Sequence, residues 1–333
     1  MSVTASSGDL AYRLRGGDRR TRRRRLVNKL MVGVCSLAAL LAVAILALIV
    51  FTVVIHGFKA LSLDFFTQPT PQLGVGQSEG AGVANAIVGS LLIILIATAI
   101  ALPIGVLVAV FTSEFAGRRV TQLVRLSLDV LNGIPSVVIG IFIFGLLVVG
   151  HGQAAWIAGV ALAIIEVPLI ARSTQEVLGL VPTSLRDASA ALGARKWKTV
   201  VRVVIPASLG GIITGTLLAI ARVAGETAPI IFVSSLAANA VSWDPSQALF
   251  TLPFAIFIYS ESPDPNDHEL AWAAALLLML FVLILSFIGR VFLARNRRKL
   301  EGGIDSGSIA LGRYFGRLRE PRRRRNGNDT DAV

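Results

Sequence analysis

The sequence predicts an all-α polytopic membrane protein with six transmembrane helices and both termini in the cytoplasm. Hydrophobic residues make up 54% of the 333 residues and charged residues only 16%, whereas a typical soluble chain carries about 25% charged residues. The apolar residues fall in long runs, of the length that a helix needs to cross a bilayer. The net charge is nevertheless +12, because basic residues gather between the runs and at the two ends.

The first apolar run covers residues 31–55 and follows a basic N-terminal tail, residues 1–30, that contains four consecutive arginines. A secretory signal peptide also has a basic region before an apolar core, but that core is only about 7–15 residues long. We therefore predict an uncleaved transmembrane helix. An extracytoplasmic loop is expected over residues 56–83.

Five further apolar runs predict the other transmembrane helices, because each is too long and too uniformly apolar for a membrane β-strand. The predicted helices are residues 84–111, 126–150, 155–178, 207–236 and 271–293. A shorter run, residues 248–259, contains Pro253 and is too short to span, which predicts an interfacial or re-entrant segment. Gly211 and Gly215 form a G-x-x-x-G pair, which predicts close helix packing.

The distribution of Lys and Arg orients these helices. With the N-terminus inside, the inner segments carry 30 of the 32 basic residues and the outer segments carry only Lys59. This asymmetry is the positive-inside pattern, and a seventh span would place the basic C-terminal tail, residues 294–333, outside. The tails contain few aromatic residues and no recognisable fold, so we interpret them as solvated charge runs in contact with water or lipid and expect no nucleic-acid partner.

The sequence lacks motifs typical of ATP-hydrolysing enzymes. No GK[ST] triplet occurs, which argues against a phosphate-binding loop of the usual kind. The three His residues and the one Cys are far apart, so we expect no metal site. The chain is therefore predicted to be non-catalytic, with no cofactor of its own.

The most informative segment is the inner loop over residues 179–206. A proline near its start prevents the fourth helix from continuing, and Ser184 with Asp187 matches a capping box that starts a new helix. Gly193 can end that helix in a left-handed conformation. A second helix then runs to Pro206. The loop is expected to form two short helices joined by a turn, lying off the membrane.

This loop resembles the EAA loop of the inner-membrane permeases of type I ABC importers, in which an acid-Ala-Ala triplet precedes a Gly and an Ile/Leu-Pro pair at fixed gaps. The corresponding residues are Asp187, Ala188, Ser189, Gly193, Ile205 and Pro206. Asp187 replaces the usual Glu, and Ser189 replaces the second Ala. The resemblance implies the type I ABC importer permease fold. It also implies a loop that docks on a separate ATPase subunit, which binds the ATP and magnesium.

Charged residues inside the predicted helices mark a candidate substrate pathway. Arg222 lies near the middle of the fifth predicted helix, where an arginine costs at least ~2.5 kcal/mol. Glu226 lies four residues on, on the same predicted helix face. Two roles remain open at this point: a buried ion pair that locks helices together, or a cationic site whose planar guanidinium suits an oxyanion such as phosphate.

Further polar residues are candidates for the same pathway. Arg172 lies near the inner end of the fourth helix, with an acid four residues on, and either snorkels to the interface or takes part in transport. Glu166 either pairs with a neighbouring helix or lines the path. Asn132 is expected to lie at a helix break whose backbone groups face the pathway. Asp129 is expected to pair with Arg125, four residues earlier.

Three motifs resemble the hallmarks of phosphate-importer permeases. They are Arg222-x-Ala-Gly-Glu226-Thr-Ala-Pro229, Asn132-Gly-Ile-Pro-Ser136 and Pro168-x3-Arg172-Ser-Thr-x-Glu176. The resemblance covers residues 84–293 and is to one of the two permease subunits of that importer. It implies ATP-driven phosphate uptake across the bacterial cytoplasmic (inner) membrane. The implied partners are a homologous second permease, two copies of a cytoplasmic ABC ATPase and an extracytoplasmic phosphate-binding protein. Arg222, Glu226 and Arg172 are the pathway residues that the resemblance carries over.

Other functions remain open on the sequence alone. A permease for molybdate or sulfate is the nearest alternative, because arginine binds any of these oxyanions. A passive channel is less favoured, because the loop over residues 181–206 would have no ATPase to dock on.

Overall fold

The computed structural model describes residues 19–71, 81–235 and 240–318, with the backbone alone for residues 19–20 and 292–318. Within these residues every regular element is helical. The outermost parts of both basic tails lie outside the described residues.

The described helices follow one another along the chain without an intervening strand. They are α2 (Arg19–Lys59), α3 (Leu63–Thr67), α4 (Ala84–Val110), α5 (Arg118–Gly133), α6 (Ser136–Ile143), α7 (Val149–His151), α8 (Ala155–Gly179), α9 (Thr183–Ala191), α10 (Lys196–Thr199), α11 (Ile205–Val223), α12 (Ala228–Val233), α13 (Leu252–Ser260) and α14 (Pro265–Leu318). Three π-helical segments lie at helix junctions: η1 (Phe111–Phe115), η2 (Phe144–Val148) and η3 (Val200–Val204).

Five helices in the described part of the chain are long and apolar enough to cross a membrane, and a bent pair brings the total to six if it is one span. The five are Thr21–Lys59, Ala84–Phe115, Ala155–Gly179, Lys196–Val223 and Pro265–Val291. The predicted all-α polytopic fold is confirmed. Two of the six predicted helices are broken or displaced. The first and the last extend beyond their predicted bounds, since α2 begins at Arg19 and α14 continues to Leu318.

The third predicted helix, residues 126–150, is broken. α5 ends at Gly133 and α6 begins at Ser136, and the two parts are bent by 92°. Ile134 and Pro135 have extended backbone between them. Proline lacks a backbone N–H and disfavours the helical conformation in the residue before it, so the helix ends at this point. The predicted break beside Asn132 is confirmed.

The fifth predicted helix, residues 207–236, is shifted toward the N-terminus. One helix of 28 residues runs from Lys196 to Val223, through η3. A turn at Ala224 and Gly225 ends it. The expected end of the second loop helix at Pro206 is wrong. Pro206 lies in the first turn of α11, where a missing N–H is tolerated, and the preceding π-helical segment absorbs the irregularity.

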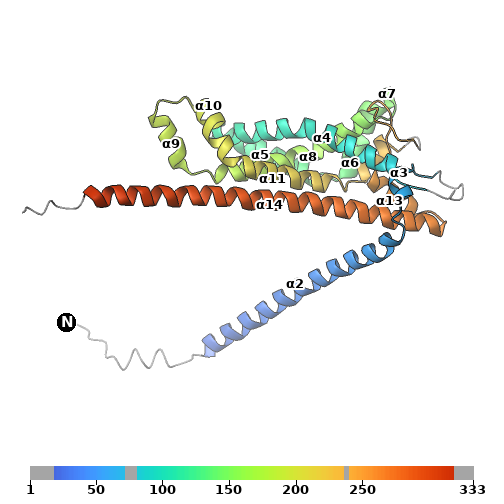
Figure 1. The fold of residues 1–333 in the computed structure, drawn as a ribbon, viewed down its shortest axis with the longest axis horizontal. Helices are drawn as coiled ribbons and strands as arrows, with labels where there is room; N and C mark the ends of the chain where they lie inside the picture. The colour runs from blue at the N-terminus through green and yellow to red at the C-terminus, as the bar shows by residue number, and fades with distance from the viewer. Residues whose placement is uncertain (1–18, 72–80, 236–239, 319–333) are drawn as a thin grey trace, which may run out of the picture.

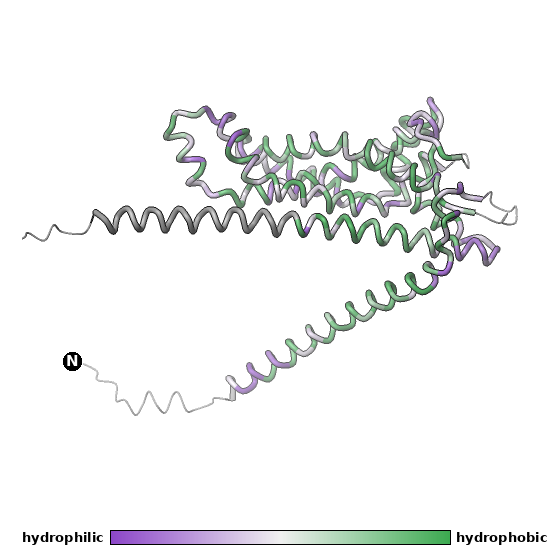
Figure 2. The backbone as a smooth tube through the Cα atoms, in the orientation of Figure 1, coloured by the Kyte–Doolittle hydropathy of each residue, from purple (hydrophilic) through white to green (hydrophobic). Residues whose placement is uncertain are grey.

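Segments predicted to share one side of the membrane gather at one end of the bundle (Figure 1). α9 and α10 lie at one end, together with the first turns of α2 and the last turns of α14. α3, α7 and the start of α14 lie at the other end. In Figure 2 the residues between these two ends are mostly hydrophobic, and hydrophilic residues gather near the ends. This arrangement agrees with an even number of spans, since the described start of α2 and the described end of α14 both lie on the side of α9.

α2 diverges from the bundle and contacts α14 near its own C-terminal end (Figure 1). His56 stacks on Trp272 with ring centroids 5.1 Å apart. A Cβ at Gly57 would lie 2.6 Å from the Trp272 carbonyl oxygen and 2.8 Å from Leu276 Cβ. The glycine therefore permits the close approach that attaches α2 to α14.

The centre of the bundle is the pair α4 and α8, where small side chains allow the backbones to approach. A Cβ at Gly159 would lie 2.4 Å from Ile96 Cγ2, and one at Gly105 would lie 2.9 Å from Ile170 Cβ. α11 also packs closely against α8. The predicted close packing at Gly211 and Gly215 is confirmed, because they lie against Val177 and Ser173 of α8.

Candidate coupling segment and membrane charges

The coupling segment, residues 181–206, begins with α9 at the tip of the bundle (Figure 1). Pro182 occupies the N-cap, and no side chain caps the helix. The predicted capping box of Ser184 and Asp187 is therefore wrong. The helix starts at Thr183, two residues earlier than that motif requires, so Ser184 lies inside the first turn.

The predicted left-handed end of α9 is confirmed at Gly193, which has φ +76°. Its N–H donates to the Ala190 carbonyl at 2.9 Å, and the Ala194 N–H donates to the Ser189 carbonyl at 3.2 Å. No neighbouring atom lies within 4 Å of where a Cβ would be built. The backbone angle, not crowding, is what requires glycine at this position.

α9 buries none of its residues and presents an exposed surface at the end of the molecule. Asp187 and Ala188 are exposed, and Leu192 is 89% exposed. Ser189 is half-buried and its hydroxyl lies 2.9 Å from the hydroxyl of Thr199, which links α9 to α10. An acidic side chain beside exposed apolar side chains is a surface suited to a protein partner.

A second link to α9 was not among the sequence predictions. Arg186 Nη2 donates to Glu114 Oε1 at 2.7 Å, and Arg186 Nε donates to the same oxygen at 3.2 Å. The guanidinium also donates to the carbonyls of Val181 at 2.7 Å and Leu178 at 3.0 Å. The Glu114 side chain is only 7% exposed. A sequence signal existed, since Glu114 is the one acid in residues 112–125.

The predicted pair of Asp129 with Arg125 is wrong. Asp129 accepts a hydrogen bond from Arg172 Nη2, and Arg125 contributes only its carbonyl oxygen, 3.3 Å from the same nitrogen. Arg172 therefore joins α8 to α5 across helices, instead of interacting with the acid four residues on. The Arg172 side chain is 33% exposed and the Asp129 side chain 60% exposed, so the pair lies at the surface of the chain.

Glu166 is fully buried on α8. Its Oε1 accepts a hydrogen bond of 3.0 Å from the Thr98 hydroxyl on α4, while Oε2 is buried without a hydrogen-bond partner. Of the two roles that the sequence left open, this geometry corresponds to contact with a neighbouring helix.

Arg222 and Glu226 do not share a helix face. Arg222 is in the last turn of α11, which ends at Val223, and Glu226 follows the turn. The two side chains form no ion pair in the ranges that the structure describes. Arg222 is exposed and Glu226 half-buried. The expectation of an i, i+4 pair on one continuous helix is wrong, because the turn at Gly225 interrupts that helix.

Asn132 is exposed in the last turn of α5, directly before the 92° break. It makes no hydrogen bond with the other candidate pathway residues among the side chains that the structure describes. The structure therefore places the candidates on three separate elements, α5, α8 and the end of α11, and connects only Arg172 to a charged neighbour.

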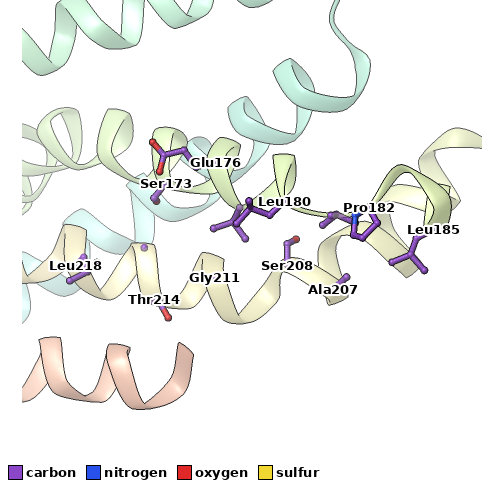
Figure 3. A pocket seen from close by; sticks show the side chains of 13 residues that line it. Ser173, Glu176, Leu180, Pro182, Leu185, Ala207, Ser208, Gly211, Thr214 and Leu218 are labelled. Carbon is purple, nitrogen blue, oxygen red and sulfur yellow. The ribbon is translucent and has the colours of Figure 1, made fainter. Parts of the chain in front are cut away.

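A cavity of about 390 Å³ lies between the inner halves of α8 and α11 (Figure 3). Its polar lining is Ser173 and Glu176 of α8 and Ser208 and Thr214 of α11. The cavity continues to Leu185 of α9. Glu176, which the sequence placed beside Arg172, therefore faces this cavity instead.

Comparison with known proteins identifies the family. The model of a family described as "Binding-protein-dependent transport system inner membrane component" matches residues 101–298. The phosphate transport system permease protein PstA of Pasteurella multocida is 39% identical over 279 residues, which cover 83% of this chain and 97% of that protein. The chain belongs to this permease family.

Other relatives agree with this assignment. PstA of Haemophilus influenzae is 38% identical, over a region that covers 82% of this chain and 96% of that protein. PstA of Mycobacterium leprae is 36% identical, over a region that covers 84% of this chain and 93% of that protein. A solved structure of the MetNI methionine ABC transporter shares the fold of this permease, with a TM-score of 0.51 at 19% identity. The match covers 65% of this chain and 94% of the MetNI chain. The type I importer permease fold is therefore confirmed.

Proposed function

We propose that this permease moves inorganic phosphate across the bacterial cytoplasmic membrane by alternating access, as a non-catalytic subunit of an ATP-driven importer. Its relatives are named as phosphate transport system permeases. In this proposal two copies of a separate cytoplasmic ATPase bind the ATP and magnesium. A homologous second permease completes the pathway, and an extracytoplasmic phosphate-binding protein delivers the substrate.

The observation that carries the proposal is the presentation of α9. The helix buries none of its own residues, yet side-chain hydrogen bonds from Arg186 and Ser189 hold it against the end of the bundle. A passive channel has no need of an exposed helix held in one position. A subunit that receives motion from an ATPase does need one, with Asp187, Ala188, Ser189, Gly193 and Pro206 as the predicted coupling residues.

Arg222 is the residue that we assign to the anion. It is exposed at the end of a transmembrane helix and has no counter-ion among the described side chains. A guanidinium at such a place is costly in lipid, so it faces either a protein partner or an aqueous path. Its planar donors suit the oxygens of phosphate. Glu226, across the turn, limits the net positive charge when no anion is bound.

Two further residues extend this path. Arg172 lies toward the coupling segment, where Asp129 neutralises it, and Asn132 lies at the broken helix. These guanidinium groups alone do not distinguish phosphate from sulfate or molybdate, because all three present similar oxygens. In the proposal, discrimination is supplied mainly by the external binding protein.

The test is reconstitution of the complete complex in vesicles, with uptake of radiolabelled phosphate, sulfate and molybdate measured separately. We expect ATP-dependent uptake of phosphate alone. An Arg222→Ala variant should lose most of this uptake, and Arg222→Lys should retain part of it. Deletion of residues 184–193 should abolish ATPase binding. Sustained phosphate uptake by Arg222→Ala would remove that residue from the pathway, and sulfate uptake without phosphate uptake would reassign the substrate.

A further inference from the structure

We propose that Arg186 and Glu114 form a mechanical clamp through which movement of α9 is passed to α4 and α8. The inference rests on the proposed function of α9 as the docking helix. It adds two positioning residues that contact neither substrate nor nucleotide, and it names the helices that receive the motion.

The contacts of Arg186 reach several elements at once. Arg186 donates to three groups outside α9: the Glu114 carboxylate and the carbonyls of Leu178 and Val181. Glu114 lies on η1, which continues α4, and Leu178 lies in the last turn of α8. One side chain therefore ties the coupling helix to two transmembrane helices at once.

α9 has few other contacts that hold it in place. No residue of α9 is buried, so apolar packing does not fix its position. Its other side-chain bond to a neighbouring element, between the hydroxyls of Ser189 and Thr199, is uncharged. A charge-assisted bond is roughly twice as strong as a neutral one. The clamp is therefore the stronger of the two links.

The clamp is attached at a rigid place. Leu178 and Val181, whose carbonyls accept from Arg186, form a separate apolar cluster with Ala109 and Val204. Thr112, next to this cluster, accepts a hydrogen bond of 2.8 Å from Gln175 of α8. Both apolar and polar contacts therefore lock the inner ends of α4 and α8 together.

The position of the guanidinium also explains why arginine is needed there. The last carbonyls of a helix lack partners within the helix and carry partial negative charge. Arg186 donates to one of them, at Leu178, which also accepts a long bond of 3.3 Å from the Val181 N–H. Its remaining donors meet Glu114 and the Val181 carbonyl. A lysine has the charge but not the planar set of donors, so it can satisfy only part of this arrangement.

The experiment uses the reconstituted complex with three variants: Arg186→Ala, Glu114→Ala and the double variant. Assembly is followed by co-purification and by the affinity for the ATPase. Coupling is followed as phosphate transported per ATP hydrolysed. We expect each single variant to assemble with ATPase affinity within about threefold of the wild type and to lose at least tenfold in the coupling ratio. The coupling ratio of the double variant should be no lower than that of the more impaired single variant, because either substitution alone already breaks the Arg186–Glu114 ion pair.

Arg118→Ala serves as the matched control, since Arg118 is an exposed arginine at the same end of the bundle and has no ion pair among the described side chains. Its coupling ratio should stay within twofold of the wild type. Arg186→Lys should recover part of the ratio that Arg186→Ala loses.

A coupling ratio within twofold of the wild type for Arg186→Ala would overturn the clamp. Loss of assembly in all of the Arg186 and Glu114 variants would also overturn it, because their role would then be structural. If the wild-type complex itself transports no phosphate, the proposed function fails. In that case ATPase binding by Arg186→Ala still shows whether α9 is positioned for docking.

Discussion

Arg172 on α8 donates a hydrogen bond to Asp129 on α5, so the two helices that meet at the surface of the bundle are joined by an ion pair. The pair lies near the break between α5 and α6. It neutralises an arginine that the proposed pathway would otherwise leave as a fixed positive charge. An anion that reaches Arg172 must compete with the carboxylate of Asp129, which would make binding at this point reversible.

This relationship predicts energetic coupling between Arg172 and Asp129. Both side chains are partly exposed, so water screens the pair and its coupling energy should be only about 0.2–1 kcal/mol. A double-mutant cycle with Arg172→Ala and Asp129→Ala, followed by thermal unfolding of the complex in detergent, measures it. The control cycle pairs Asp129→Ala with Arg125→Ala. A larger coupling energy in the control than in the Arg172 cycle would contradict the observed pairing.

Glu166 yields a prediction that separates a packing role from a transport role. Glu166→Ala removes the acceptor of the half-buried Thr98 hydroxyl, and losing an ordinary hydrogen bond costs about 0.5–1.5 kcal/mol. Glu166→Gln keeps an oxygen acceptor and nearly the same volume. We expect Glu166→Ala to lower the thermal unfolding temperature of the complex and Glu166→Gln to retain both stability and phosphate uptake.

Thr98→Val is the matched control for this prediction, because it removes the other partner of the same bond while keeping the shape. It leaves both oxygens of the fully buried Glu166 carboxyl without a hydrogen-bond partner, so it should also lower the thermal unfolding temperature. A stable Glu166→Gln complex that has lost phosphate uptake would show that the charge of Glu166 is needed for transport, contrary to the packing role.

The fold could be predicted from the sequence because bilayer thickness sets a minimum length for each apolar run. Boundaries were less predictable, as Val223 shows: apart from Glu226 and Thr227 the apolar run continues past it, but the chain turns at Ala224 and Gly225. Hydropathy does not detect such a turn. The break at Pro135 could be expected, since proline acts locally on the backbone.

Among the site residues, too, local backbone features were predictable from the sequence, and contacts between distant residues were not. Gly193 was predictable, because its φ of +76° is a property of one residue. The partners of Asp129 and Glu166 were not, because Arg172 and Thr98 reach them from other helices. Pairs at four-residue spacing are the natural expectation from sequence. In this chain, however, contacts between helices determine which partners the charged side chains have.

Gly193 predicts how the end of α9 affects ATPase binding. A residue with a Cβ in the left-handed region costs about 1–2 kcal/mol, and the surroundings add no clash. Gly193→Ala should therefore weaken ATPase binding by about five- to thirtyfold, and Gly193→Asn should weaken it less. Gly179→Ala is the control, since Gly179 is helical and equally uncrowded. Equal affinities for the two alanine variants would show that the left-handed turn does not position the docking surface.

The contact between α8 and α11 supplies the last prediction. A Cβ at Gly211 would lie 2.4 Å from Val177 Cγ1, so Gly211→Ala must push the two helices apart. Overpacking of this kind costs about 1–3 kcal/mol, and it would also change the cavity that Gly211 lines. We expect a lower thermal unfolding temperature for the complex.

Gly33→Ala on α2 is the matched control, because no atom lies within 4 Å of the added Cβ. There the substitution replaces glycine in a helix without a clash, so stability should be unchanged or rise by about 0.5–1 kcal/mol. The two substitutions add the same methyl group, and their opposite signs would therefore report on packing alone. If Gly211→Ala proved as stable as Gly33→Ala, α8 and α11 would have to lie farther apart in the assembled importer than in the isolated chain.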